Sequence, residues 1–178
     1  MTNVKGKPIY RRRISPLEGF FLHSPYAIVT MTARITGEVT EDMLQKAIYK
    51  VQERHTNLRL KLEFDDRGDP WFTSRDVQDI QVEIIPREND QGWMEVIRQQ
   101  SLIPFEFQVR PAIRFLLVQS PSESELVIFC HHMICDGLSL AYLTRDLMSA
   151  LGDPTIQLEI LEDPIIRTKF ILSIERFC

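Results

Sequence analysis

The sequence lacks a long apolar run, a secretion signal and an excess of basic charge. A transmembrane helix needs about 20 consecutive apolar residues, and no stretch approaches that length, so we expect no membrane span. The lysines near the N-terminus are not followed by the apolar core of a signal peptide. A cytoplasmic location is therefore the expectation.

A net charge of −4 argues against a general nucleic-acid-binding protein. The one basic cluster, Arg11 to Arg13, lies between apolar residues in "IYRRRIS". Such a cluster is typical of a solvated strand face rather than of a nucleic-acid site. We therefore expect no nucleic-acid partner.

Cysteine is also scarce, and its three copies cannot pair completely. Cys130 and Cys135 flank two histidines, and without a secretion signal we expect them to be reduced thiols that serve in packing. No repeat and no Gly/Ser linker divides the 178 residues. A chain of this length buries roughly 70% of the surface that it exposes when unfolded, so residues 1–178 are predicted to form a single domain.

Hydrophobic periodicity predicts an alternation of strands and helices. The predicted strands are 26–37, 57–64, 71–74, 80–85, 112–118 and 125–130. The predicted helices begin near Thr40, residue 90 and Gly137, and Gly152 with Pro154 ends the last one. The runs 112–118 and 125–130 are almost entirely apolar and predict a buried hairpin. This order indicates an α/β fold, an α+β two-layer sandwich whose mixed sheet is covered by helices.

Each of two predicted helices carries an apolar stripe that should face the core. In the helix after Thr40 the stripe is Met43, Leu44, Ala47, Ile48 and Val51. In the helix after Gly137 it is Leu138, Ala141, Tyr142, Leu147, Met148 and Leu151.

The stretch "VIFCHHMICDGLSLAYL", residues 127–143, holds the densest group of chemically versatile side chains. One interpretation is packing, with His131 and His132 as the polar end of a core strand. A second is a metal site, whose candidate ligands are Cys130, His131, His132, Cys135 and Asp136. Their spacing matches no zinc knuckle and no H-E-x-x-H helix, so we expect no metal.

The third interpretation is catalysis. Successive strand residues point to opposite faces, so one histidine can be packed while the other faces a cleft. A neutral imidazole with a pKa of about 6.5 can accept a proton from a hydroxyl or amine near neutral pH. Asp136 would either pair with that imidazole or hold the loop through an ion pair. Gly137 would allow a sharp bend or the close approach of a substrate.

"HHMICDG" resembles the H-H-x-x-x-D-G motif of the chloramphenicol acetyltransferase-like superfamily. That superfamily includes condensation domains of nonribosomal peptide synthetases, polyketide-associated acyltransferases and wax ester synthases. "ISPLEGFFL", "RHTNLRLKL" and "PFEFQVRPAIRFLLV" are similar to further elements of its condensation-like members. The resemblance extends from about residue 10 to 152, in the order of the family.

The resemblance implies an acyltransferase that needs no bound cofactor and no metal. His132 would be the catalytic base, assisting an alcohol or amine acceptor as it attacks an acyl thioester of coenzyme A or of a phosphopantetheinyl carrier protein. His131 would support it. Asp136 would be structural and pair with Arg59, or alternatively with Arg114, to hold the loop, and Gly137 would allow the bend.

The chain departs from the family in length, because full members join two similar halves around a tunnel. This chain resembles an N-terminal half, so a C-terminal half or another chain is an expected partner. Residues 153–178, with the apolar "KFILSIERFC", would be a crossover or an interface tail. The alternatives are an oligomer that completes the site, and a non-catalytic module or inactive fragment that docks a carrier protein or another partner.

Overall fold

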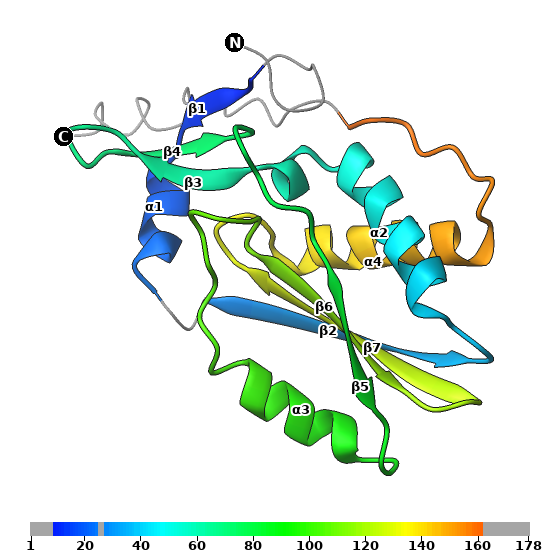
Figure 1. Ribbon diagram of the computed structural model, residues 1–178. Helices are drawn as coiled ribbons and strands as arrows, with labels where there is room; N and C mark the ends of the chain where they lie inside the picture. Colours follow the sequence, from blue (N-terminus) through cyan, green and yellow to red (C-terminus); the bar gives the residue numbers. More distant parts are fainter. Residues whose placement is uncertain (1–8, 25–26, 162–178) are drawn as a thin grey trace, which may run out of the picture.

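The computed structural model describes residues 9–24 and 27–161 (Figure 1). These residues form two β-sheets, α-helices on both faces of the larger sheet, and one short 3₁₀ helix. The elements in chain order are β1 (Arg11–Arg13), α1 (Pro16–Leu22), β2 (Ile28–Thr36), α2 (Glu41–Arg54), the 3₁₀ helix η1 (Thr56–Arg59), β3 (Lys61–Phe64), β4 (Pro70–Thr73), β5 (Val82–Pro86), α3 (Gly92–Gln100), β6 (Ile113–Gln119), β7 (Glu123–His131) and α4 (Gly137–Gly152).

The larger sheet has the strand order β2-β7-β6-β5. β7 is antiparallel to both of its neighbours, and it forms the predicted hairpin with β6. β5 runs parallel to β6, which requires a crossover, and α3 lies in that connection. The predicted α/β fold with a mixed sheet covered by helices is therefore confirmed.

The two faces of β6 and β7 pack against different helices. Phe115 and Ile128 belong to a core shared with α2 and α4, whereas Leu116 and Phe129 pack with Trp93 of α3 on the other face. Burying one large apolar side chain contributes roughly 1.5–3 kcal/mol. The nearly unbroken apolar sequence of both strands is explained by this coverage on both sides (Figure 1).

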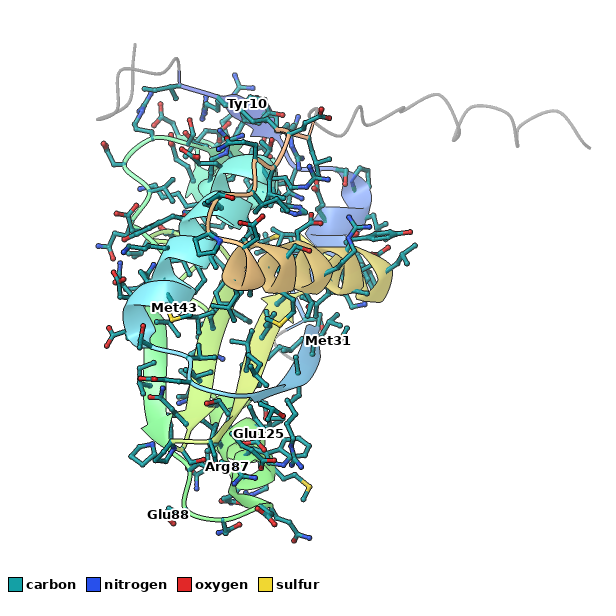
Figure 2. The ribbon with its side chains drawn as sticks, turned by 90° about the vertical axis from the view of Figure 1, so that its right-hand side faces the viewer. Tyr10, Met31, Met43, Arg87, Glu88 and Glu125 are labelled. Carbon is teal, nitrogen blue, oxygen red and sulfur yellow. The ribbon has the colours of Figure 1, made fainter. Side chains whose placement is uncertain are left out.

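The start of β7 carries a buried charge. Glu125 is only 1% exposed, and its carboxylate lies 3.0 Å from the guanidinium groups of Arg34 and Arg87. Figure 2 shows Arg87 and Glu125 together at this end of the sheet. The end of β7 opposite to His131 is thus closed by ion pairs.

The apolar face of α2 is largely as predicted, and that of α4 is only partly so: Leu147 is buried, and Met148 and Leu151 pack against the core. Met43 alone of the α2 stripe stays 39% exposed, because it lies in the first turn. In α4 the predicted residues Leu138 and Tyr142 are 64% and 50% exposed. The buried face of α4 consists of Leu140, Leu143, Asp146, Leu147 and Ala150. Because Asp146 lies within this buried stripe, the apolar residues of α4 alone do not show the helical period of its buried face.

The second sheet has the order β1-β4-β3. The predicted strand 57–64 is only partly correct, because Thr56–Arg59 form η1 and only Lys61–Phe64 pair as a strand. Leu58 still points into the core, since one 3₁₀ turn carries the chain from α2 to the sheet. The basic cluster Arg11–Arg13 is strand β1, as predicted.

Helix α1 was not predicted, although the sequence contains its start signal. The Ser15 hydroxyl accepts a hydrogen bond from the Glu18 backbone, and the Glu18 carboxylate accepts one from the Ser15 backbone. This reciprocal capping box, with Pro16 at the first turn, starts the helix. The Glu18 carboxylate also binds Arg12 at 2.7 Å, which fixes α1 against β1.

After α4 the chain returns along α2 (Figure 1). Lys50 donates to the carbonyl of Ile156 at 3.1 Å, and Arg54 donates to that of Glu159 at 2.6 Å. The Leu161 amide donates to the Arg54 carbonyl at 2.9 Å. Residues 153–161 are therefore attached to α2, whereas the apolar tail and the rest of the expected crossover, 162–178, lie outside the described residues.

None of the helices formed by the described residues is long and apolar enough to cross a membrane.

Candidate functional site

The His-His stretch occupies the junction between β7 and α4. β7 ends at His131, a short loop follows, and α4 begins at Gly137. Asp136 is the N-cap of α4, and its carboxylate accepts a hydrogen bond from the Ser139 amide at 2.7 Å. This hydrogen bond, with the Ser139 side chain, lowers the pKa of Asp136 below its ordinary value.

Both ring nitrogens of His131 are engaged. Its Nε2 donates to the Ser24 carbonyl at 3.2 Å, and its Nδ1 accepts from the Met133 amide at 3.2 Å. These partners fix a neutral tautomer with the proton on Nε2. The ring is 1% exposed and meets the faces of Phe105 and Phe107 edge-on. Burial lowers the pKa of His131, so this histidine is a neutral packing residue.

His132 has a different environment. Its ring stacks on that of Phe21 in α1, with a centroid distance of 4.5 Å and an interplanar angle of 10°. Its backbone amide donates to the Ala27 carbonyl at 2.7 Å, which fixes the position of the residue. Its side chain is half-buried, and no hydrogen bond joins its ring nitrogens to another described residue. Within the part of the chain that the structure describes, the ring is thus held by stacking and its nitrogens have no hydrogen-bond partner.

The expected ion pair of Arg59 and Asp136 is not formed. Asp136 uses its carboxylate to cap α4, which directs it to the free amides at the helix start. Arg59 donates to the Thr56 hydroxyl at 3.2 Å instead.

The alternative partner of Asp136 is also engaged elsewhere. The guanidinium of Arg114 lies 4.7 Å from the Phe105 ring centroid and 5.5 Å from that of Phe129, and it donates to the Gln100 carbonyl. Burial lowers the pKa of Arg114. Neither predicted arginine therefore anchors the motif loop, residues 132–136, through Asp136.

Gly137 adopts an ordinary helical conformation, so the expected sharp bend does not require it. A Cβ atom added at this position would meet no atom within 4 Å. The space beside the Gly137 backbone is therefore unfilled by other described residues. The close approach of a substrate at this position stays a prediction.

A residue that the sequence analysis did not single out holds the motif loop. The Asn57 side-chain amide in η1 donates to the Ile134 carbonyl at 3.0 Å. The "RHTNLR" element therefore does contact the motif, but through its asparagine. Asparagine is common in turns, and no other feature of the sequence indicates this contact.

The first two residues of the same element bind α4. The Asp146 carboxylate lies 2.7 Å from Arg54, 3.0 Å from His55 and 2.8 Å from Arg145. Burial alone would raise the pKa of Asp146, but the hydrogen bonds from Arg145, His55 and Arg54 outweigh it and lower this pKa. Burial lowers the pKa of His55 despite its bond to Asp146. This cluster joins α2 to α4.

A pocket of about 240 Å³ lies between these elements and the motif loop. It is lined by the 3₁₀ segment, the end of β7, the loop and the start of α4, and its residues include His55, Asn57, Cys130, Cys135 and Ser139. His132 does not line it. Among the described residues, no group of three or more His, Cys, Asp or Glu side chains is placed to hold a metal ion.

Comparisons with known proteins agree on one family. The Condensation domain family matches residues 12–154. The chain is 30% identical over 129 residues to the nonribosomal peptide synthetase agiA of Aspergillus flavus, covering 70% of this chain and 2% of the synthetase. It is 31% identical over 142 residues to a dimodular nonribosomal peptide synthase of Bacillus subtilis, covering 74% of this chain and 6% of the synthase.

Among solved structures, the fold matches the starter condensation domain of rhizomide synthetase RzmA. The TM-score is 0.70 at 16% identity, and the match covers 84% of this chain and 40% of that chain. The protein thus spans less than half of the solved chain and a few per cent of the synthetases. With most of its own length matched by the family, the chain belongs to the Condensation domain family.

Proposed function

We propose that the protein supplies the N-terminal, histidine-bearing half of an acyltransferase that joins a thioester-bound acyl group to an amine or alcohol acceptor. The difference between the two histidines carries the proposal. His131 uses both ring nitrogens in hydrogen bonds, whereas His132 has a positioned ring whose nitrogens bond to no other residue in the described ranges. A free, fixed imidazole is what a general base needs.

In the proposed reaction His132 takes a proton from the acceptor as the acceptor nitrogen or oxygen attacks the acyl carbonyl. The carbon–sulfur bond of the thioester breaks, and the thiol leaves. No acyl-enzyme is required, because the thioester is already activated, and positioning with proton removal accounts for the rate.

The names of the relatives favour one donor class. Two of them are nonribosomal peptide synthetases, so we propose an acyl group on a phosphopantetheinyl carrier protein as the donor, with acyl-coenzyme A as the alternative. The acceptor is a small molecule or a second carrier-bound group. We assign the supporting structural roles to His131, Asp136 and Gly137, and the remaining part of the tunnel to a C-terminal half or another chain.

The test is thiol release from an acyl thioester in the presence of an amine or alcohol acceptor. The coding region is read beyond Cys178, and the full polypeptide that it encodes is assayed. His132→Ala should lower turnover about 10²- to 10⁴-fold, the usual contribution of a general base. His23→Ala, at the exposed end of α1, is the matched control and should leave the rate unchanged.

A non-catalytic docking module is the second candidate, because the chain spans only 40% of the solved condensation domain. In that case an acyl-carrier protein would bind without thiol release, and binding would be the same with His132→Ala. That outcome, in a folded variant, would refute the general base.

A further inference from the structure

Two thiols bracket the motif loop and converge on the pocket behind it. Cys130 is the penultimate residue of β7, and Cys135 directly precedes the N-cap of α4. Both are free and both line the pocket. We propose that Cys130 and Cys135 are a redox modification site, which a hydroperoxide converts into a reversible disulfide that fixes the loop carrying His132.

The fold brings the two thiols to the wall of one pocket. There the Cys130 thiol donates to the His131 carbonyl, and the Cys135 thiol donates to the Asp136 carbonyl. A disulfide needs a sulfur–sulfur distance of about 2.05 Å and Cβ atoms about 3.8 Å apart. Bond formation would require Cys135, which lies in a loop, to move toward Cys130, because Cys130 is held in the sheet by its pairing with Val29 and Ile113.

The two thiols differ in reactivity. Burial raises the pKa of Cys130 well above its ordinary value, and that residue is 0% exposed. The hydrogen bond from Cys130 lowers the pKa of Cys135, which is 9% exposed. The thiolate is the attacking species, so Cys135 is the thiol that reacts first and Cys130 is the one that resolves.

The pocket gives a small oxidant a route to Cys135. Its volume of about 240 Å³ exceeds that of a hydroperoxide, and His55, Asn57 and Ser139 add polar groups to its wall. A water molecule occupies about 30 Å³ in the liquid. The reactive thiol is therefore reached from the pocket rather than from the His132 side of the loop.

The reaction is balanced in two steps. The Cys135 thiolate attacks one oxygen of the peroxide, the O–O bond breaks, and Cys135 sulfenic acid and hydroxide form. The Cys130 thiol then attacks the sulfenic sulfur, loses its proton and expels hydroxide, which leaves as water. Overall, two thiols and one hydrogen peroxide give one disulfide and two waters, and a dithiol reductant reverses the change.

The bond would close a ring that contains His131 to Ile134. The loop that positions His132 is otherwise held by the Asn57 amide and the Ala27 carbonyl. A covalent link across its base removes much of its remaining freedom. Reversible cytosolic disulfides are usually regulatory or catalytic rather than structural, which agrees with a link that switches the loop.

The test counts thiols by mass spectrometry after hydrogen peroxide treatment, quenching and alkylation of the unfolded chain. Cys178→Ser serves as the background, so that only the two proposed thiols remain. We expect two alkylated sites before oxidation, none after it, and two again after dithiothreitol. In the oxidised form, amide hydrogen exchange of residues 131–136 should be slower than in the reduced form.

Single variants identify the order of attack. With Cys130→Ser, peroxide should leave a sulfenic acid on Cys135 that dimedone traps, whereas with Cys135→Ser, Cys130 should stay alkylatable. Two alkylated sites after oxidation would overturn the disulfide, and equal oxidation of the two single variants would overturn the order of attack. Unchanged exchange in an oxidised protein would overturn its action on the loop. None of these measurements depends on acyl transfer.

Discussion

The two ends of β7 differ in how completely their polar side chains are paired. At its start, Glu125 is 1% exposed and neutralised by Arg34 and Arg87. At its other end the ring nitrogens of His131 are both hydrogen-bonded, whereas just beyond it the ring of His132 stacks on Phe21 and hydrogen-bonds no other described residue. The same strand thus has one end where a buried charge is neutralised by two ion pairs and another where a half-buried imidazole has no hydrogen bond from its ring to another described residue.

Glu125→Gln should have the largest effect on folding. It removes the negative charge between two guanidinium groups, and breaking a buried pair costs about 3–5 kcal/mol. We expect the free energy of unfolding, measured in urea, to fall by about 3 kcal/mol. This is the low end of the range, because Arg87 keeps its contacts to Glu123 and Asp90. Glu123→Gln, at a 38% exposed side chain on the same strand, should cost less than about 1 kcal/mol. Equal costs would mean that burial does not distinguish the two carboxylates.

Acid should weaken the histidine-containing part of the fold. Burial lowers the pKa values of His55 and His131 in the folded protein. Their contribution to the free energy of unfolding is therefore complete above the pKa of histidine in the unfolded chain, about 6.5. It is lost as the pH falls through the lower folded values. The free energy of unfolding should therefore be smaller at pH 5 than at pH 7.5.

His131→Gln should reduce this pH dependence, because one of the two titrating groups is gone. His23→Gln, at the exposed end of α1, should keep it. An unfolding free energy that is the same at both pH values in the unmodified protein would contradict the assignment of buried neutral histidines.

Asn57→Ala should release the motif loop from η1. A single hydrogen bond contributes about 0.5–1.5 kcal/mol, so a loss of about 1 kcal/mol in unfolding is expected. Faster amide exchange should be confined to the loop around Ile134. Gln52→Ala is the matched control, since Gln52 donates to the Leu58 carbonyl in the same region without touching the motif. Its loop exchange should be unchanged, and a similar change in both variants would refute a specific role for Asn57.

Asp136 variants should give the smallest effects on folding. Asp136→Ala removes a helix cap and should cost about 1 kcal/mol, whereas Asp136→Asn retains a good cap and should cost less than about 0.5 kcal/mol. Thermal or urea unfolding measures both. A loss of about 3–5 kcal/mol in either variant would point instead to the buried ion pair that the family resemblance implies.

The sequence was informative where one local rule decides the outcome. The apolar runs of β6 and β7 and the cap at Thr40 identified their elements. Strand alternation does not separate the two histidines of the motif, because β7 ends at His131 and the second histidine lies in the turn that follows. The hydrophobic pattern failed where a residue distant in the sequence determines whether a polar side chain can be buried. The buried face of α4 contains Asp146, which is acceptable only because Arg54 and His55 meet it from another helix.

In the motif loop, too, the sequence pattern does not identify which partner a polar side chain takes. A carboxylate next to a helix start has two competing partners, an arginine across the fold and the amides of its own helix. The family resemblance favoured the arginine, whereas Asp136 takes the local amide of Ser139. The contact between the "RHTNLR" element and the loop was expected, but the atoms that make it, the Asn57 amide and the Ile134 carbonyl, could not be read from spacing.

The return of residues 153–161 along α2 makes this stretch a spacer of defined length. Lys50 and Arg54 hold the carbonyls of Ile156 and Glu159, and the Arg54 carbonyl holds the Leu161 amide. A residue inserted between the first two carbonyls would shift the later contacts out of register without disturbing the sheet. The contacts with α2 therefore determine the position of Leu161, and with it the point from which the chain continues.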